Sequence, residues 1–194
     1  MVFCFKFQQY NNIIGRRNMY KNVTTKEIVL SGLLLATGVI LPMMFHIFKI
    51  TGSMFLPMHI PVLLGGMLLS PSVALVLGII TPFLSSILTG MPVLFPMAVI
   101  MAFELGAYGF IASLAVRRFK LSILSSLLIS MVSGRIAAGL SVALLIKLFG
   151  IKMSPVIYVK GAIITGIPGI IIQLIFIPPL IYAIKRYFNK SLQC

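Results

Sequence analysis

The sequence predicts an all-α integral membrane protein, a bundle of six transmembrane helices of which the second is short. The first observation behind this prediction is composition: 60% of the 194 residues are hydrophobic and 9% are charged. A soluble domain carries about 25% charged residues, so this chain cannot cover a globule with polar side chains. The second is that Pro, Gly and charged residues divide the chain into apolar segments, most of them long enough to cross a bilayer. Together they exclude an ordinary soluble enzyme and a disordered protein.

The expected spans are residues 28–48, 57–70, 72–89, 94–116, 121–148 and 157–184. The second of these has 14 residues, which rise about 21 Å as a helix and fall short of the bilayer. We expect either a short helix sheltered by its neighbours or a re-entrant segment, because irregular backbone at membrane depth needs cover. The domain division is therefore a basic tail at 1–27, a membrane domain at 28–186 and a second tail at 187–194.

The distribution of basic residues predicts the orientation. With the N-terminus inside, eleven Lys and Arg residues lie at inner ends and four at outer ends, as the positive-inside rule requires. Both termini are then cytoplasmic, in the plasma membrane. Residues 1–18 are either a true basic extension or an artefact of the assigned start site, because Met19 would begin the chain naturally before the span that opens at Ile28. The first 27 residues lack the features of a signal peptide.

Acidic residues are nearly absent, since Glu27 and Glu104 are the only two. This argues against hydrolysis by paired carboxylates and against a carboxylate-held Mg²⁺ site. The sequence shows no nucleotide-binding loop, no nucleophile–base arrangement and no metal-ligand spacing. We therefore expect no enzyme activity, cofactor or metal. The net charge of +14 favours an anionic lipid surface rather than nucleic acid, given the hydrophobicity.

Two charged residues lie at mid-span and suggest an internal polar site. Glu104 falls well inside the fourth span and Arg135 near the middle of the fifth. Because a charge at a helix centre costs about 2.5–3.5 kcal/mol to insert, such residues pair or face a cavity. We expect a Glu104–Arg135 pair. It could either fix helix packing alone or form part of a ligand pocket.

Other polar residues fall near this pair in the predicted spans. Met97, Met101, Glu104 and Tyr108 occupy one narrow arc of the fourth span, a soft wall with one hydroxyl. In the sixth span, Lys160 lies near the outer mouth, and Gln173 at mid-span needs a hydrogen-bonding partner.

Two similar strings, LPMHIPVLL at 56–64 and MPVLFPMAV at 91–99, place prolines among Met and aliphatic residues. Both should begin their spans with non-helical backbone, because proline has no N–H to donate. They could simply start helices, or they could line one outward-facing cavity. In the second interpretation His59 and Phe95 become candidate ligand contacts, although a lone interfacial His is more often solvated.

The ordered strings FLPMHIPVLLGGMLLSPSVALVLGIITPFLSSILTGMP, FPMAVIMAFELGAYGF and SGRIAAG resemble the substrate-binding S component of an energy-coupling factor (ECF) transporter, over about residues 25–185. The resemblance implies a subunit that binds a vitamin or precursor from outside with high affinity. It implies as partners a transmembrane T component and two cytoplasmic ATPase subunits. It also implies an outward pocket near the loops at 49–56 and 89–96, and contact of the T component with Gly32 and Ala36, a small-residue pair on the first span.

Pantothenate, a flavin and a cobalamin precursor all stay open as the ligand. The alternative function is a self-sufficient secondary carrier or channel with Glu104 as its proton site; small size and the lack of a detectable inverted repeat disfavour it. The candidate substrate-binding residues are His59, Phe95, Met101, Glu104, Tyr108, Arg135, Lys160 and Gln173.

Overall fold

A computed structural model describes residues 23–47, 56–151 and 154–191, with side chains except at 46–47 and 185–191. Helices joined by short turns make up the described residues, which contain no strand. Its elements are α2 (Thr25–Ile47), α4 (His59–Leu68), α5 (Pro71–Thr89), the π-helical turn η1 (Leu94–Ala98), α6 (Val99–Arg117), α7 (Ile123–Phe149) and α8 (Pro155–Ser191). The predicted class, a helical membrane bundle with a short second helix, is confirmed, and most of the predicted span ends lie within a few residues of the helix ends.

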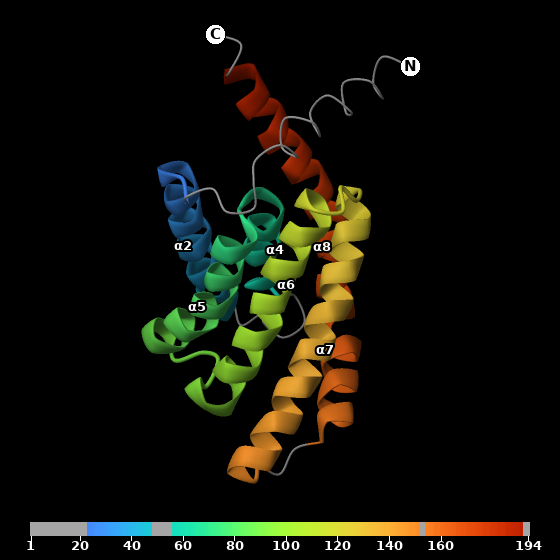
Figure 1. Ribbon diagram of the computed structural model, residues 1–194. Helices are drawn as coiled ribbons and strands as arrows, with labels where there is room; N and C mark the ends of the chain where they lie inside the picture. The colour runs from blue at the N-terminus through green and yellow to red at the C-terminus, as the bar shows by residue number, and fades with distance from the viewer. Residues whose placement is uncertain (1–22, 48–55, 152–153, 192–194) are drawn as a thin grey trace.

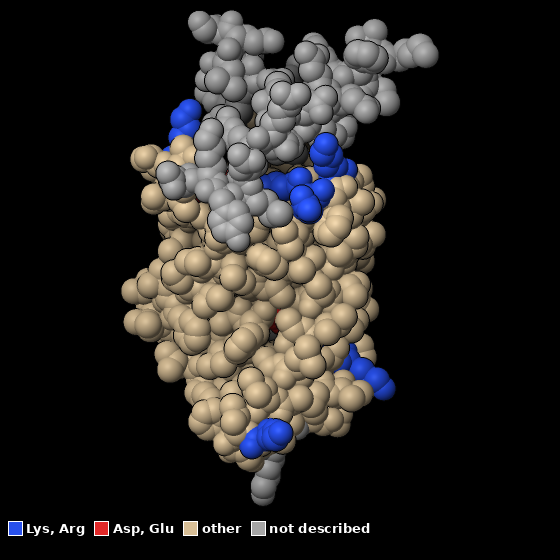
Figure 2. All heavy atoms as spheres, viewed as in Figure 1, with Lys and Arg blue, Asp and Glu red and all other residues tan. Residues whose placement is uncertain are grey.

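Successive helices run in opposite directions, so that α2 begins and α8 ends at the same end of the bundle (Figure 1). In the described residues, five helices are long and apolar enough to cross a membrane, and α4 is a sixth, shorter one. On the face shown in Figure 2, basic side chains lie toward both ends of the molecule, and the band between them is uncharged except for a small acidic spot near its centre. This is the charge distribution of a protein whose middle lies in hydrocarbon.

The short helix α4 lies inside the bundle, packed against α2, α5, α6 and α8. Eight of its ten residues are buried. Its last carbonyls have partners outside the helix: Arg117 Nη2 donates to the Leu68 carbonyl at 2.8 Å, and the Ser113 hydroxyl donates to the Leu69 carbonyl at 2.8 Å. Because these bonds satisfy carbonyls that a helix end leaves free, a ten-residue helix is stable here. Of the two predictions for this segment, the sheltered helix is correct.

The first proline of each string precedes its helix as predicted, whereas the second lies within a helical element, Pro61 in α4 and Pro96 in η1. Pro57 precedes α4, and Pro92 lies in non-helical backbone before η1. Within η1, the backbone of Phe95 is extended. Pro61 is the third residue of α4. A first-turn residue has no intrahelical acceptor for its N–H, so proline is tolerated there.

Helices α5 and α6 make a close contact through glycine. A Cβ atom on Gly78 of α5 would overlap the Leu105 carbonyl of α6, and one on Gly109 of α6 would overlap the Ala74 carbonyl of α5. Small residues let the backbones of membrane helices approach in this way. The contact fixes α6, which carries the acidic residue of the site described next.

At the end of the bundle where α2 begins, the other acidic residue links three helices. Glu27 of α2 lies 3.4 Å from Arg117 of α6 and accepts a hydrogen bond of 3.1 Å from Ser70, the residue before α5. Both glutamates of the chain are thus engaged by arginines, Glu27 here and Glu104 at mid-bundle.

Candidate functional site

A buried polar cluster lies at the middle of the bundle, where α4, α6 and α7 meet. Glu104 of α6 is at its centre, with 3% of its side chain exposed. Arg135 Nη1 of α7 lies 2.6 Å from Glu104 Oε1, and the Tyr108 hydroxyl, one turn along α6, donates to the same oxygen at 2.9 Å. The predicted Glu104–Arg135 pair is confirmed. Its geometry is that of a charge-assisted hydrogen bond in a site nearly closed to solvent.

His59, the first residue of α4, completes the cluster on its other side. Its Nε2 lies 3.5 Å from Glu104 Oε1, and its ring centroid is 5.2 Å from that of Tyr108. The residue is 2% exposed, and neither ring nitrogen has a hydrogen-bond partner among the described residues. His59 is therefore a buried polar group with unused hydrogen-bonding capacity beside a carboxylate.

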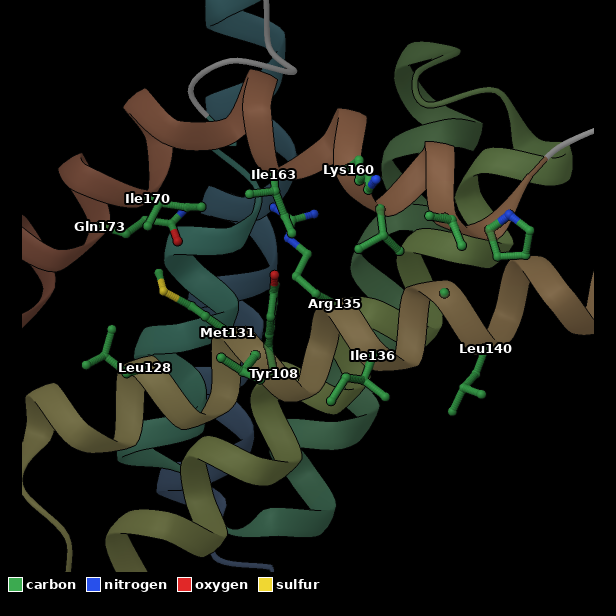
Figure 3. Close-up of a pocket in the computed structure, with 15 residues that line it drawn as sticks. Tyr108, Leu128, Met131, Arg135, Ile136, Leu140, Lys160, Ile163, Ile170 and Gln173 are labelled. Atoms are coloured by element: carbon green, nitrogen blue, oxygen red, sulfur yellow. The ribbon is translucent and has the colours of Figure 1, made fainter.

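A cavity of about 700 Å³ opens beside this cluster, between α7 and α8. Figure 3 shows Arg135 reaching from α7 toward α8, with the Tyr108 ring beside it. The cavity is lined by Tyr108, Leu128, Met131, Val132, Arg135, Ile136, Gly139, Leu140, Pro155, Val156, Val159, Lys160, Ile163, Ile170 and Gln173. Its volume is in the range of small-molecule binding sites. Arg135 links it to the buried cluster, because the same side chain lines the cavity and pairs with Glu104.

Four of the eight candidate residues line the cavity: Tyr108, Arg135, Lys160 and Gln173. Gln173 is 1% exposed, and its side-chain amide donates to the Leu56 carbonyl over a long 3.5 Å. This is the kind of partner that a mid-span glutamine requires. Lys160 is exposed at the cavity wall.

The other four candidates lie outside the wall of this cavity. Glu104 and His59 are in the cluster behind Arg135, and Met101 is half-buried against the main core. Phe95 is 44% exposed at the start of η1–α6, where its ring packs edge-on against Phe149 at 5.1 Å. One of the two interpretations of the proline strings places both along one cavity. For the cavity between α7 and α8 this interpretation is wrong, because its wall comes from α6, α7 and α8.

The apolar wall of the cavity could not be read from the sequence. On α7 it consists of Leu128, Val132, Ile136 and Leu140, each four residues from the next. This spacing places them on one face of a helix. This four-residue spacing is visible in the sequence. However, a span that is apolar on every side does not show which of its faces packs against a neighbouring helix.

The small residues of α2 lie on an exposed face. Gly32 and Ala36 are both exposed, and a Cβ atom on Gly32 would meet nothing within 4 Å. Among the described residues, no other helix packs closely against α2 at Gly32. The same helix has large exposed apolar side chains at Val29 and Leu33.

Among residues whose side chains are described, no three His, Cys, Asp or Glu groups converge in a way that could hold a metal ion. Together the cluster and the cavity present an apolar wall, an arginine paired with a carboxylate, an amide and a lysine. The fold is that of a helical membrane protein, and its cavity has the volume of a small-molecule site.

A sequence model of the family described as "ECF transporter, substrate-specific component" matches residues 26–181, about four fifths of the chain. The chain belongs to this family and is a substrate-specific component of an ECF transporter. Comparisons with curated proteins and with solved structures found no match.

Proposed function

We propose that this protein captures a vitamin or vitamin precursor from outside the cell, in the cavity between α7 and α8. The observation that carries the proposal is Arg135, which both lines the cavity and forms the buried pair with Glu104. A ligand that contacts Arg135 would therefore affect α4, α6 and α7 together, because these three helices contribute the residues of the buried cluster. Residues 28–186 would form the membrane domain, with both termini cytoplasmic and the residues before and after it as tails.

The proposed partners are a transmembrane T component and two cytoplasmic ATPase subunits, which would supply the energy for import. The exposed small-residue face at Gly32 and Ala36 supports a docking surface on α2, because small residues allow another helix to approach closely. Ligand binding would precede docking, and docking would reorient the bundle for release inside.

The alternative, a self-sufficient carrier with Glu104 as its proton site, fits the cluster less well. Protonating Glu104 would leave Arg135 charged and unpaired, with 11% of its side chain exposed. Breaking one partner of a buried ion pair in this way is strongly unfavourable. The purified chain alone in liposomes should therefore carry no solute without its partners.

A paired substitution tests the docking surface. Gly32→Leu should abolish co-purification of the T component and ATPases, while Gly161→Leu should leave it intact. Both glycines are exposed on helices, and a Cβ atom added to either would meet nothing within 4 Å, so both variants should fold. Retention of the partners by Gly32→Leu at the level of Gly161→Leu would refute the assignment of this face.

Ligand identification tests the cavity. The wild-type protein, purified from rich medium, should release a stoichiometric small molecule on denaturation, detected by mass spectrometry. Arg135→Gln combined with Glu104→Gln should release none while remaining folded. A wild-type protein that is empty and binds none of a panel of vitamins would count against a vitamin substrate.

A further inference from the structure

The cavity between α7 and α8 is long and mainly apolar. Eleven of its fifteen lining residues are apolar or glycine. On α8 the lining runs from Pro155 to Gln173, a helical rise of about 27 Å. Val132, Ile136 and Leu140 are each more than half exposed on its α7 rim. Most of a ligand in this cavity would therefore touch hydrocarbon side chains.

The polar groups of the cavity are already occupied along most of its length. Tyr108 donates its hydroxyl to Glu104, and Arg135 is neutralised by the same carboxylate. The amide of Gln173 donates to the Leu56 carbonyl. A highly hydroxylated ligand would lose water here without finding enough partners, and burying polar groups without hydrogen bonds is costly.

Lys160 is different, because no acidic side chain among the described residues is paired with it. The chain has two acidic side chains, and each is engaged by an arginine, Glu27 by Arg117 and Glu104 by Arg135. Lys160 lines the cavity and is exposed toward the end of α8 at which Pro155 lies. The cavity thus has a cationic group near one end and an apolar body beyond it.

From this arrangement we infer the substrate class: an elongated amphipathic small molecule with one anionic end at Lys160 and an apolar body along α7 and α8. The inference rests on the proposed function, in which the cavity is the substrate site. The charge of Lys160 complements a carboxylate or phosphate head, and the apolar wall complements the body. Each methylene added to the body should raise the affinity about fourfold until the cavity is filled.

The test measures saturable binding of radiolabelled decanoate to the full chain in phosphatidylcholine nanodiscs. Nanodiscs replace detergent because a detergent is itself an amphiphile. Wild-type protein should bind about one decanoate per chain, more tightly than hexanoate or octanoate. Gluconate, a carboxylate with a hydroxylated body, should not compete. Lys160→Gln should weaken decanoate binding by up to about fivefold, the range of an exposed ion pair, and leave decanol binding unchanged.

A matched pair of variants separates the cavity from the lipid. Ile136→Trp should fill the cavity and lower decanoate binding at least tenfold, whereas Ile129→Trp should bind like wild type. Both isoleucines are on α7 and exposed, and Ile136 lines the cavity while Ile129 does not belong to its lining. Partition of decanoate into the nanodisc is the same for both variants, so the difference reports the cavity.

Three results would overturn the inference: equal binding by the two tryptophan variants, no saturable decanoate binding by the wild type, or gluconate binding as tightly as decanoate. Native mass spectrometry adds a fourth. Phosphatidylcholine bound to the wild type and absent from Ile136→Trp would identify the occupant as membrane lipid rather than substrate. Co-purification of partner subunits with Ile136→Trp is measured separately, so a failure of the transporter assignment is distinguished from a failure of this one.

Discussion

The ring of Tyr108 on α6 lies directly against the backbone of Gly134 on α7, so closely that a Cβ atom on Gly134 would overlap the ring. Arg135 follows Gly134 in the chain, and Glu104 precedes Tyr108 by one helical turn. The absence of a side chain at position 134 therefore brings the arginine within reach of the carboxylate. Gly134 therefore determines both how closely α6 and α7 pack and how the polar cluster is assembled.

Gly134→Ala should destabilise the protein by about 1–3 kcal/mol, because the buried Tyr108 ring has to move to admit a methyl group. The matched control is Gly161→Ala on α8, where a Cβ atom meets nothing within 4 Å. There the helix propensity of alanine should leave stability equal or slightly higher. Thermal unfolding of the two purified variants compares them. Equal unfolding temperatures for the two would show that Tyr108 is not held in place by the contact.

The Glu104–Arg135 pair should behave as a coupled unit. Glu104→Gln and Arg135→Gln should each cost about 3–5 kcal/mol, because each leaves a buried charge without its partner. The double variant should recover most of that loss in thermal unfolding. If the pair only fixes helix packing, the double variant regains ligand binding as well; if Arg135 contacts the ligand, it regains stability alone. A double variant no more stable than the worse single one would show that the two residues are not coupled.

Tyr108 and His59 should respond in opposite ways to loss of their polar groups. Tyr108→Phe removes a hydrogen bond to a carboxylate and should cost about 1.5–3 kcal/mol. His59→Leu removes nitrogens that have no hydrogen-bond partner among the described residues, so stability should stay equal or rise. Chemical unfolding in mild detergent measures both. A large loss in His59→Leu would indicate that the imidazole interacts favourably with Glu104 across their 3.5 Å separation.

The orientation of the bundle is tested with two equivalent phenylalanines. Phe119, after α6, is 68% exposed, and Phe149, at the end of α7, is 64% exposed. In a background with Cys4 and Cys194 replaced by Ser, a membrane-impermeant maleimide should label Phe149→Cys in intact cells. It should label Phe119→Cys only after permeabilisation. The reverse pattern would place both termini outside.

The helices could be predicted from the sequence because their limits are set locally. The C-cap glycines Gly90 and Gly150 have left-handed backbone, and Pro71 begins α5, so composition marks these boundaries. The Glu104–Arg135 pair was also accessible, since few partners exist for a charge at mid-span. The cavity wall was not, because it depends on how far apart α7 and α8 pack. That distance is a property of two apolar surfaces that look alike in sequence.

Phe95 is a residue whose position in the bundle could not be predicted from the sequence. The resemblance of its string to the one around His59 suggested a shared cavity, but the two segments begin helices at different depths. His59 starts α4 beside Glu104 in the middle of the bundle, and Phe95 lies at the end of the bundle near Phe149. The depth at which a string lies in the bundle depends on the length of the helix that it begins. Helix α4 has only ten residues, so His59 at its start lies deep in the bundle.

That length also bears on how the chain enters the membrane during synthesis. Ten residues rise about 15 Å, half of the hydrocarbon thickness, so α4 is too short to partition across the bilayer as an independent segment. Leu69 and Ser70 alone separate it from α5, and the carbonyls at its end are satisfied by side chains of α6. Helices α4 and α5 would therefore insert as one hairpin, with α4 reaching its final depth only after α6 has been made.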